Sequence, residues 1–149
     1  MILNIYKPKG ITSFGVVKKI RNIISEKKVG HGGTLDPFAE GVLIVGTGKD
    51  TKKLKNITDS DKSYTASIQL GKITDTLDPE GVVTRKKKIP KLNNLKIDKI
   101  LNSFLGISMQ TPPMFSAKKI GGVKLYELAR KNIIIDREKA QINISDISL

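Results

Sequence analysis

Cysteine is absent from the sequence, and histidine occurs once, as His31. Without cysteine the chain can form no disulfide, no thiolate zinc site and no thiol nucleophile. A single histidine also argues against a structural zinc site, because such sites combine several His or Cys ligands. Redox chemistry at thiols and zinc-dependent folding are therefore set aside.

Aromatic residues and long apolar runs are also scarce. Phe and Tyr together number seven and Trp is absent, which argues against an extended platform for base stacking. No charge-free apolar run approaches the roughly 18 residues of a membrane span. The first residues, MILNIYKPKG, lack the order of charged then apolar regions that marks a signal peptide. We therefore expect a cytoplasmic protein, and its 149 residues suit a single domain.

Positive charge is abundant and evenly spread. The net charge is +13; residues 1–75 carry 13 basic and 7 acidic side chains, and residues 76–149 carry 14 and 7. A domain that is basic throughout indicates a polyanion partner, most often nucleic acid. A lysine-rich compositional bias is the alternative explanation, so charge alone favours nucleic acid only modestly.

The first third of the chain shows a strand, a helix and a loop. Residues 2–6 are typical of a short strand, and apolar residues at helical spacing predict a helix over 13–24 with Ser13 as its cap. The polar, glycine-rich residues 25–37 are predicted as loop. Asp36 before Pro37 is a common helix start, and GTGKD (46–50) is then interpreted as the turn that ends a helix.

The remainder alternates between strand and helix patterns. YTASIQL (64–70) has the strict alternation of a half-buried strand, and VVTRKK (82–87) is predicted as its return strand. A helix is expected around 97–105, ended by Gly106, and a short one in KLYELARK (124–131). QINISDISL (141–149) begins to alternate, so the chain is predicted to stop inside a strand. Hairpins mixed with separate helices indicate an α+β fold without an internal domain boundary.

The sequence does not match several common motifs for nucleotide binding, calcium binding or nucleophilic catalysis. GTGKDT lacks the first glycine and the Ser or Thr after Gly-Lys that a P-loop requires. Asp75 and Asp78 lack calcium-loop spacing and are explained by turn chemistry. A Ser-His-Asp triad would have to use His31, and Asp36 is too close to His31 in sequence to favour that arrangement. RKKK (85–88) is interpreted as a solvated strand end, with phosphate contact as the second possibility.

Residues 30–43, GHGGTLDPFAEGVL, contain the sole histidine, three glycines and an Asp-Pro pair. On pattern alone, a helix cap explains Asp36 and a surface loop position explains His31. This stretch, however, closely resembles the catalytic loop of the tRNA pseudouridine synthase B (TruB) family. Four further segments resemble that family in the same order: KPKGITS (7–13), DKSYTASIQLG (61–71), TDTLDPEG (74–81) and QTPPMFSAKKIGGVKLYELAR (110–130).

The resemblance implies a catalytic domain of pseudouridine synthase type, α+β with a mainly antiparallel sheet and flanking helices. It implies isomerisation of a uridine in the T-arm of tRNA, with no cofactor and no metal. Asp36 is then the catalytic aspartate, and Tyr64 packs on the target base. His31 lies in the loop that keeps the extruded uridine out of the RNA stack, and residues 110–139 form a thumb-like RNA-contact segment.

The resemblance covers only the N-terminal part of such an enzyme. The family's catalytic arginine lies in a Gly-Thr-Tyr-Ile-Arg-like motif, and none of Arg21, Arg85, Arg130 and Arg137 has that context. A C-terminal RNA-binding domain is also not expected in this chain. The resemblance therefore leaves a synthase represented by a truncated chain, or a catalytically incomplete RNA-binding piece of one. A general basic nucleic-acid chaperone is a third possibility.

Overall fold

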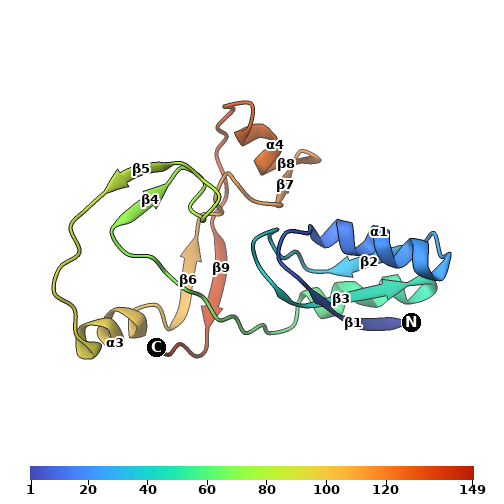
Figure 1. Cartoon of the computed structure of the whole chain (residues 1–149), viewed down its shortest axis with the longest axis horizontal. Coiled ribbons are helices and arrows are strands. Elements are labelled where there is room, and N and C mark those ends of the chain that lie inside the picture. Colours follow the sequence, from blue (N-terminus) through green and yellow to red (C-terminus); the bar gives the residue numbers. More distant parts are fainter. The chain divides into compact units, whose positions relative to one another are not determined.

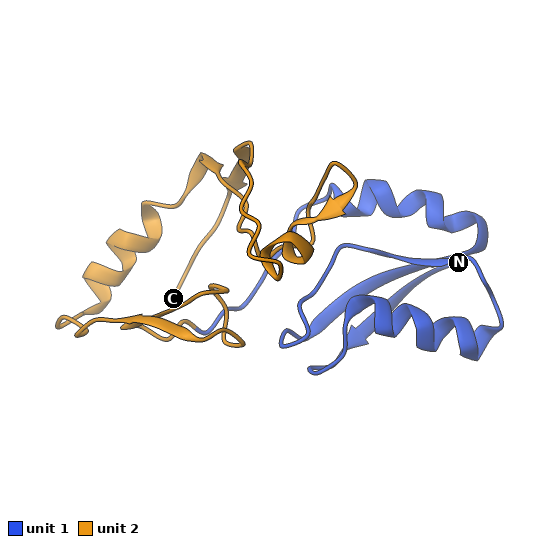
Figure 2. Ribbon diagram, turned by 90° about the horizontal axis from the view of Figure 1, so that it is seen from above, with its two compact units in different colours: residues 1–67 blue, residues 68–149 orange.

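The computed structural model describes all 149 residues, which form two compact units, residues 1–67 and 68–149 (Figure 1; Figure 2). All strand pairs are antiparallel and helices accompany them, which confirms the α+β prediction. No helix is both long enough and apolar enough to cross a membrane.

The elements of unit 1 are β1 (Ile2–Lys7), α1 (Ser13–Ile24), β2 (Val29–Gly32), β3 (Gly41–Thr47), the 3-10 helix η1 (Gly48–Lys53) and α2 (Leu54–Thr58). Those of unit 2 are β4 (Lys72–Thr74), β5 (Val83–Lys86), α3 (Asn94–Asn102), β6 (Gly106–Gln110), β7 (Lys119–Ile120), β8 (Val123–Lys124), α4 (Leu125–Ala129) and β9 (Ala140–Ile144).

Unit 1 is a three-stranded sheet with a helical layer on each face. The strand order is β1-β3-β2, and Figure 2 shows α1 on one side of the sheet and the helical stretch of η1 and α2 on the other. The apolar stripe of α1 packs on apolar side chains of β2 and β3, as its helical spacing predicted. The resulting core consists of Val16, Val17, Ile20, Val29, Leu43 and Val45.

The start of α1 differs from the prediction by one residue. Thr12 is the N-cap: its backbone is extended and its hydroxyl accepts from the Gly15 amide at 2.9 Å. Ser13 is the first helical residue, is buried, and uses its hydroxyl elsewhere. The helix bounds were predicted correctly, but the capping residue was not, because Thr and Ser are both good caps and only the backbone geometry distinguishes them.

Two predictions around the glycine-rich stretch were wrong. Residues 29–32, predicted as loop, form the edge strand β2, and residues 41–47 form the central strand β3 rather than a helix. Glycine is only weakly disfavoured in strands, and here the hydrogen bonds between β2 and β3 outweigh that low strand propensity. GTGKD therefore ends a strand and begins η1.

Unit 2 consists of small two-stranded sheets. β4 pairs with β5 around the predicted turn, β6 with β9, and β7 with β8. α3 ends at Asn102, earlier than predicted, and Gly106 is the first residue of β6, a strand that sequence reasoning missed. β9 ends at Ile144, so the prediction that the chain stops within a strand was wrong.

The alternating stretch 64–70 is not a strand, which contradicts our prediction. All residues from 61 to 70 are exposed, and no strand pairs with them. A strand requires hydrogen bonds to a neighbour, and alternation by itself supplies none. The predicted return strand exists as β5, but it pairs with residues 72–74 instead.

Candidate functional site

The segment that follows β1 holds the turn around Asp36 from both sides. The Ser13 hydroxyl donates to the Leu35 carbonyl at 3.0 Å and accepts from the Leu35 amide at 2.9 Å. The Gly10 amide donates to the Pro37 carbonyl at 2.8 Å. The residues on either side of Asp36 are therefore hydrogen-bonded to a segment more than twenty positions earlier in the chain.

Lys7 completes this arrangement from the interior. Its side chain is fully buried, and Nζ donates to the carbonyls of Pro8 at 3.1 Å, Ile11 at 2.9 Å and Ala39 at 2.6 Å. A buried ammonium needs such partners because water no longer solvates it. The bond to Ala39 joins the start of the 7–13 segment to the end of the Asp36 turn. Sequence reasoning assigned no role to Lys7 and did not predict the pair of hydrogen bonds between Ser13 and Leu35, which we call the Ser13 clasp. Both residues belong to the KPKGITS motif identified in the sequence.

Asp36 itself is exposed at this supported turn. The Ala39 amide donates to the Asp36 carbonyl at 3.1 Å, which closes a single turn rather than starting a helix. The helix-cap explanation of Asp36 is therefore wrong. The Asp36 carboxylate makes no ion pair, since the salt bridges of the chain involve Asp50 and Glu40. It is thus an accessible carboxylate on a constrained backbone.

The carboxylate of Glu40 lies at the end of the same turn, next to β1. The Tyr6 hydroxyl donates to Glu40 Oε2 at 2.6 Å, and Lys9 Nζ lies 3.5 Å from Oε1. The bond from Tyr6, followed by the charge of Lys9, holds the pKa of Glu40 below its ordinary value. The same bond raises the pKa of Tyr6, because it favours the protonated phenol.

His31 lies in β2, half-buried, opposite Val45 of β3. Its Nδ1 donates to the Gly33 carbonyl, so the ring is held by the backbone two residues on. Gly33 has a φ of +105°, a conformation that L side chains rarely adopt, which explains one glycine of the loop. A Cβ on Gly32 would lie 3.3 Å from a δ-carbon of Leu54, which is tighter than an ordinary contact, whereas a Cβ on Gly30 would lie 3.4 Å from the other δ-carbon.

Tyr64 does not join His31 and Asp36 through any hydrogen bond. Its side chain is 73% exposed and lies in a stretch without helix or strand. Of the three predicted site residues, His31 lies on β2 and Asp36 on the turn that follows β2. Tyr64 lies on a separate, exposed segment.

A cavity of about 710 Å³ opens beside β2, in unit 1. His31 lines it together with basic side chains, while Asp36 and Tyr64 do not. No three His, Asp or Glu side chains gather as a metal-ligand set. We refer to this cavity as the β2 groove.

Comparison with known proteins identifies the family. Residues 21–149 match the TruB family pseudouridylate synthase (N terminal domain). Proteins named tRNA pseudouridine synthase B are 46% identical in Clostridium acetobutylicum, over 99% of this chain and 51% of that protein, and 42% identical in Mycoplasma mobile, over 100% and 52%. A chain in the crystal structure of a Cbf5-Nop10-Gar1 complex is 29% identical with a TM-score of 0.51, covering 79% of this chain and 30% of that one.

The family match and the likeness to a solved structure thus define a class, the N-terminal domains of pseudouridylate synthases. The chain belongs to the TruB family of pseudouridylate synthases. It spans about half the length of the curated relatives that it matches.

Proposed function

We propose that this chain isomerises a uridine in the T-arm of tRNA to pseudouridine, with Asp36 as the catalytic carboxylate. The observation that carries the proposal is the sequence identity of 46% over 99% of the chain to a tRNA pseudouridine synthase B. The geometry supports it, because an exposed carboxylate lies on a turn held at Leu35, Pro37 and Ala39.

The reaction exchanges one bond for another within the same nucleotide. The bond between the sugar and N1 of uracil breaks, the base turns over, and a bond from the sugar to C5 forms. C5 loses its hydrogen and N1 gains one, so atoms and electrons balance without an oxidant. Asp36 would act as nucleophile at the sugar or as the group that stabilises and transfers charge and protons.

The target base must leave its stack before Asp36 can reach it. Extrusion costs a few kcal/mol, which contacts to phosphates can offset. The exposed ring of Tyr64 is available to pack on the base. We propose that His31, held by Gly33, shapes the loop that keeps the base out of the stack.

The experiment that tests the proposal measures tritium release from C5 of uridine in a T-arm stem-loop RNA. We expect turnover by the chain, its loss in Asp36→Asn, and no change in Asp59→Asn, a matched exposed aspartate. Turnover that survives in Asp36→Asn would refute the role of Asp36.

A second candidate is a catalytically incomplete RNA-binding piece of such an enzyme. The observation that favours it is the absence of the family's arginine motif among the four arginines of the chain. It predicts preferential binding of the T-arm stem-loop over unrelated RNA, with no tritium release by the wild-type chain. A general nucleic-acid chaperone would instead show no preference between the two RNAs.

A further inference from the structure

The β2 groove is lined by a set of cationic side chains that the proposed catalytic turn does not use. They come from α1, from the turn before β2, and from α2: Arg21, Lys27, Lys28 and Lys55. His31 adds an imidazole from β2 itself. No acidic side chain lines the groove. Glu26, the nearest acidic residue in sequence, accepts a hydrogen bond from the Lys28 amide at 2.9 Å.

One side of the groove is formed by a fixed guanidinium and an edge strand. Arg21 Nη2 donates to the Val29 carbonyl at 2.8 Å, which fixes the guanidinium beside β2. β2 is an edge strand, so its outward backbone N–H groups lack a strand partner. A fixed guanidinium beside an edge strand, surrounded by lysine ammonium groups, is suited to anionic oxygens.

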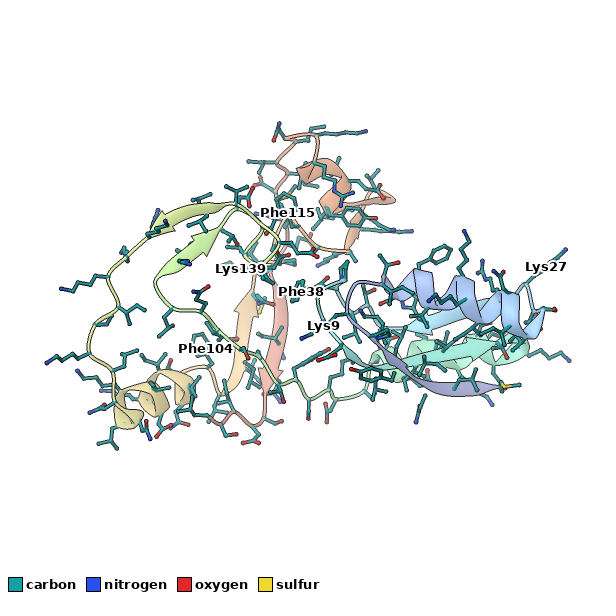
Figure 3. The ribbon with its side chains drawn as sticks, viewed as in Figure 1. Lys9, Lys27, Phe38, Phe104, Phe115 and Lys139 are labelled. Carbon is teal, nitrogen blue, oxygen red and sulfur yellow. The ribbon has the colours of Figure 1, made fainter.

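The groove lies at the end of α1 opposite the Asp36 turn. Ser13, at the first turn of α1, contacts Leu35, whereas Arg21, at the last turn, contacts Val29. Figure 3 shows Lys9 and Phe38 at one end of unit 1 and Lys27 at the other. Ser13 and Arg21 are eight residues apart in α1, which at about 1.5 Å per residue separates the two places by about 12 Å along the helix axis.

We infer that the β2 groove binds the phosphate backbone of RNA at a position separate from the Asp36 turn. RNA as the polyanion rests on the proposed function; the groove's affinity for phosphate oxygens rests on its own side chains. Arg21 and the groove lysines would anchor a part of the RNA outside the reacting nucleotide and contribute affinity and orientation without touching the base. His31, which also lines the groove, is the one lining residue that the proposed function places near the base.

The test compares two triple variants of the full chain that remove the same charge. The groove variant carries Lys27→Gln, Lys28→Gln and Lys55→Gln; the control variant carries Lys91→Gln, Lys96→Gln and Lys99→Gln. All six lysines are exposed and none forms a salt bridge. Both variants should therefore fold as the wild-type chain does, which circular dichroism can verify.

Binding of a labelled tRNA transcript is measured by fluorescence anisotropy over a series of salt concentrations. Each phosphate contact contributes about 0.7 to the slope of log K against log salt for a single strand. We expect the groove variant to lose about 2 from that slope and on the order of tenfold in affinity at low salt. The control variant should lose less than half as much. Equal losses in the two variants, or none in the groove variant, would overturn the inference.

Two further readouts separate this inference from the proposed function. Hydrogen exchange should slow at residues 27–31 and 54–58 when tRNA is added, and exchange unchanged there would count against the groove. Tritium release that persists in the groove variant with a raised KM and an unchanged kcat supports both ideas. Groove-dependent binding without any tritium release refutes the catalytic proposal alone. Displacement of tRNA by polyglutamate as effectively as by RNA of equal charge would exclude RNA recognition by the groove.

Discussion

Units 1 and 2 are similar in length but differ sharply in what they bury. Of eight buried apolar side chains, seven lie in unit 1, and Leu125 alone lies in unit 2. Unit 1 has three paired strands with helices on both faces, whereas α3 of unit 2 buries no residue and every residue of β6 is exposed. Independent stability requires three or more strands or a covering helix. The turn that carries Asp36 therefore lies on the well-packed part of the molecule.

The largest expected effect comes from truncating one leucine in each unit. Leu43 lies in the core of unit 1 at 2% exposure, and Leu95 on α3 is 79% exposed. We expect Leu43→Ala to lower the free energy of unfolding by about 2–5 kcal/mol, and Leu95→Ala to change it by less than about 0.5 kcal/mol. Urea unfolding followed by circular dichroism measures both. Similar losses in the two variants would mean that unit 2 has a core of comparable strength.

Replacing the buried Lys7 side chain removes the hydrogen bond that links β1 to the Asp36 turn. Lys7→Met keeps the volume but leaves the carbonyls of Pro8, Ile11 and Ala39 without their charged donor. We expect a loss of about 2 kcal/mol in the free energy of unfolding, with faster hydrogen exchange at residues 37–41. Lys18→Met, at an exposed position of α1, is the control and should have little effect. Unchanged exchange at the turn would show that Lys7 does not hold it.

Removing the Ser13 hydroxyl should have a smaller and more local effect. Ser13→Ala deletes both hydrogen bonds to Leu35 and should cost about 1–2 kcal/mol. The amide of Leu35 should exchange faster, while the amides of β6 in unit 2 should not change. Ser63→Ala, at an exposed position, is the matched control. Equal hydrogen exchange of the Leu35 amide in both variants would show that the Ser13 hydroxyl does not hold Leu35.

Acid should weaken unit 1 slightly, and more than unit 2. The bond from Tyr6 lowers the pKa of Glu40, and the bond from Lys53, followed by that from the N-terminus, lowers the pKa of Asp50. Each contribution to stability is therefore present above the unfolded pKa, about 4.3 for Glu and 3.9 for Asp, and is lost as the pH falls through the folded pKa.

Hydrogen exchange of β3 and β6 at about pH 6 and about pH 3, corrected for intrinsic rates, measures this difference. We expect the protection of β3 to fall more than that of β6. The double variant Glu40→Gln, Asp50→Asn should show a smaller change in β3 than the wild-type chain. A fall of equal size in the double variant would mean that other groups cause the acid sensitivity.

Local pattern was a good guide where an element's own residues decide its conformation. The stripe of Val16, Val17 and Ile20 predicted α1 and the face that it buries. The turn at 74–81 and the strand after it were also predicted, although the strand before the turn is β4 and not residues 64–70. Among the glycines near Asp36, Gly33 is explained by its positive φ and Gly32 by the close packing of Leu54, although residues 29–32 form β2 and not the predicted loop. The roles of Asp36, His31 and Tyr64 remain predictions until the variants are assayed.

By itself, the sequence determined the family, the α+β class, the positive charge and the helix of unit 1, because these depend on residue identity and short-range spacing. Only the tertiary structure decided that the glycine-rich residues 29–32 pair as an edge strand and that the alternating residues 64–70 do not pair at all. It alone brought Lys7 and Ser13 against the Asp36 turn and gathered Arg21, Lys28 and Lys55 in one groove. Strand pairing and side-chain clusters depend on partners that are distant in the chain, and a local sequence pattern does not specify those partners.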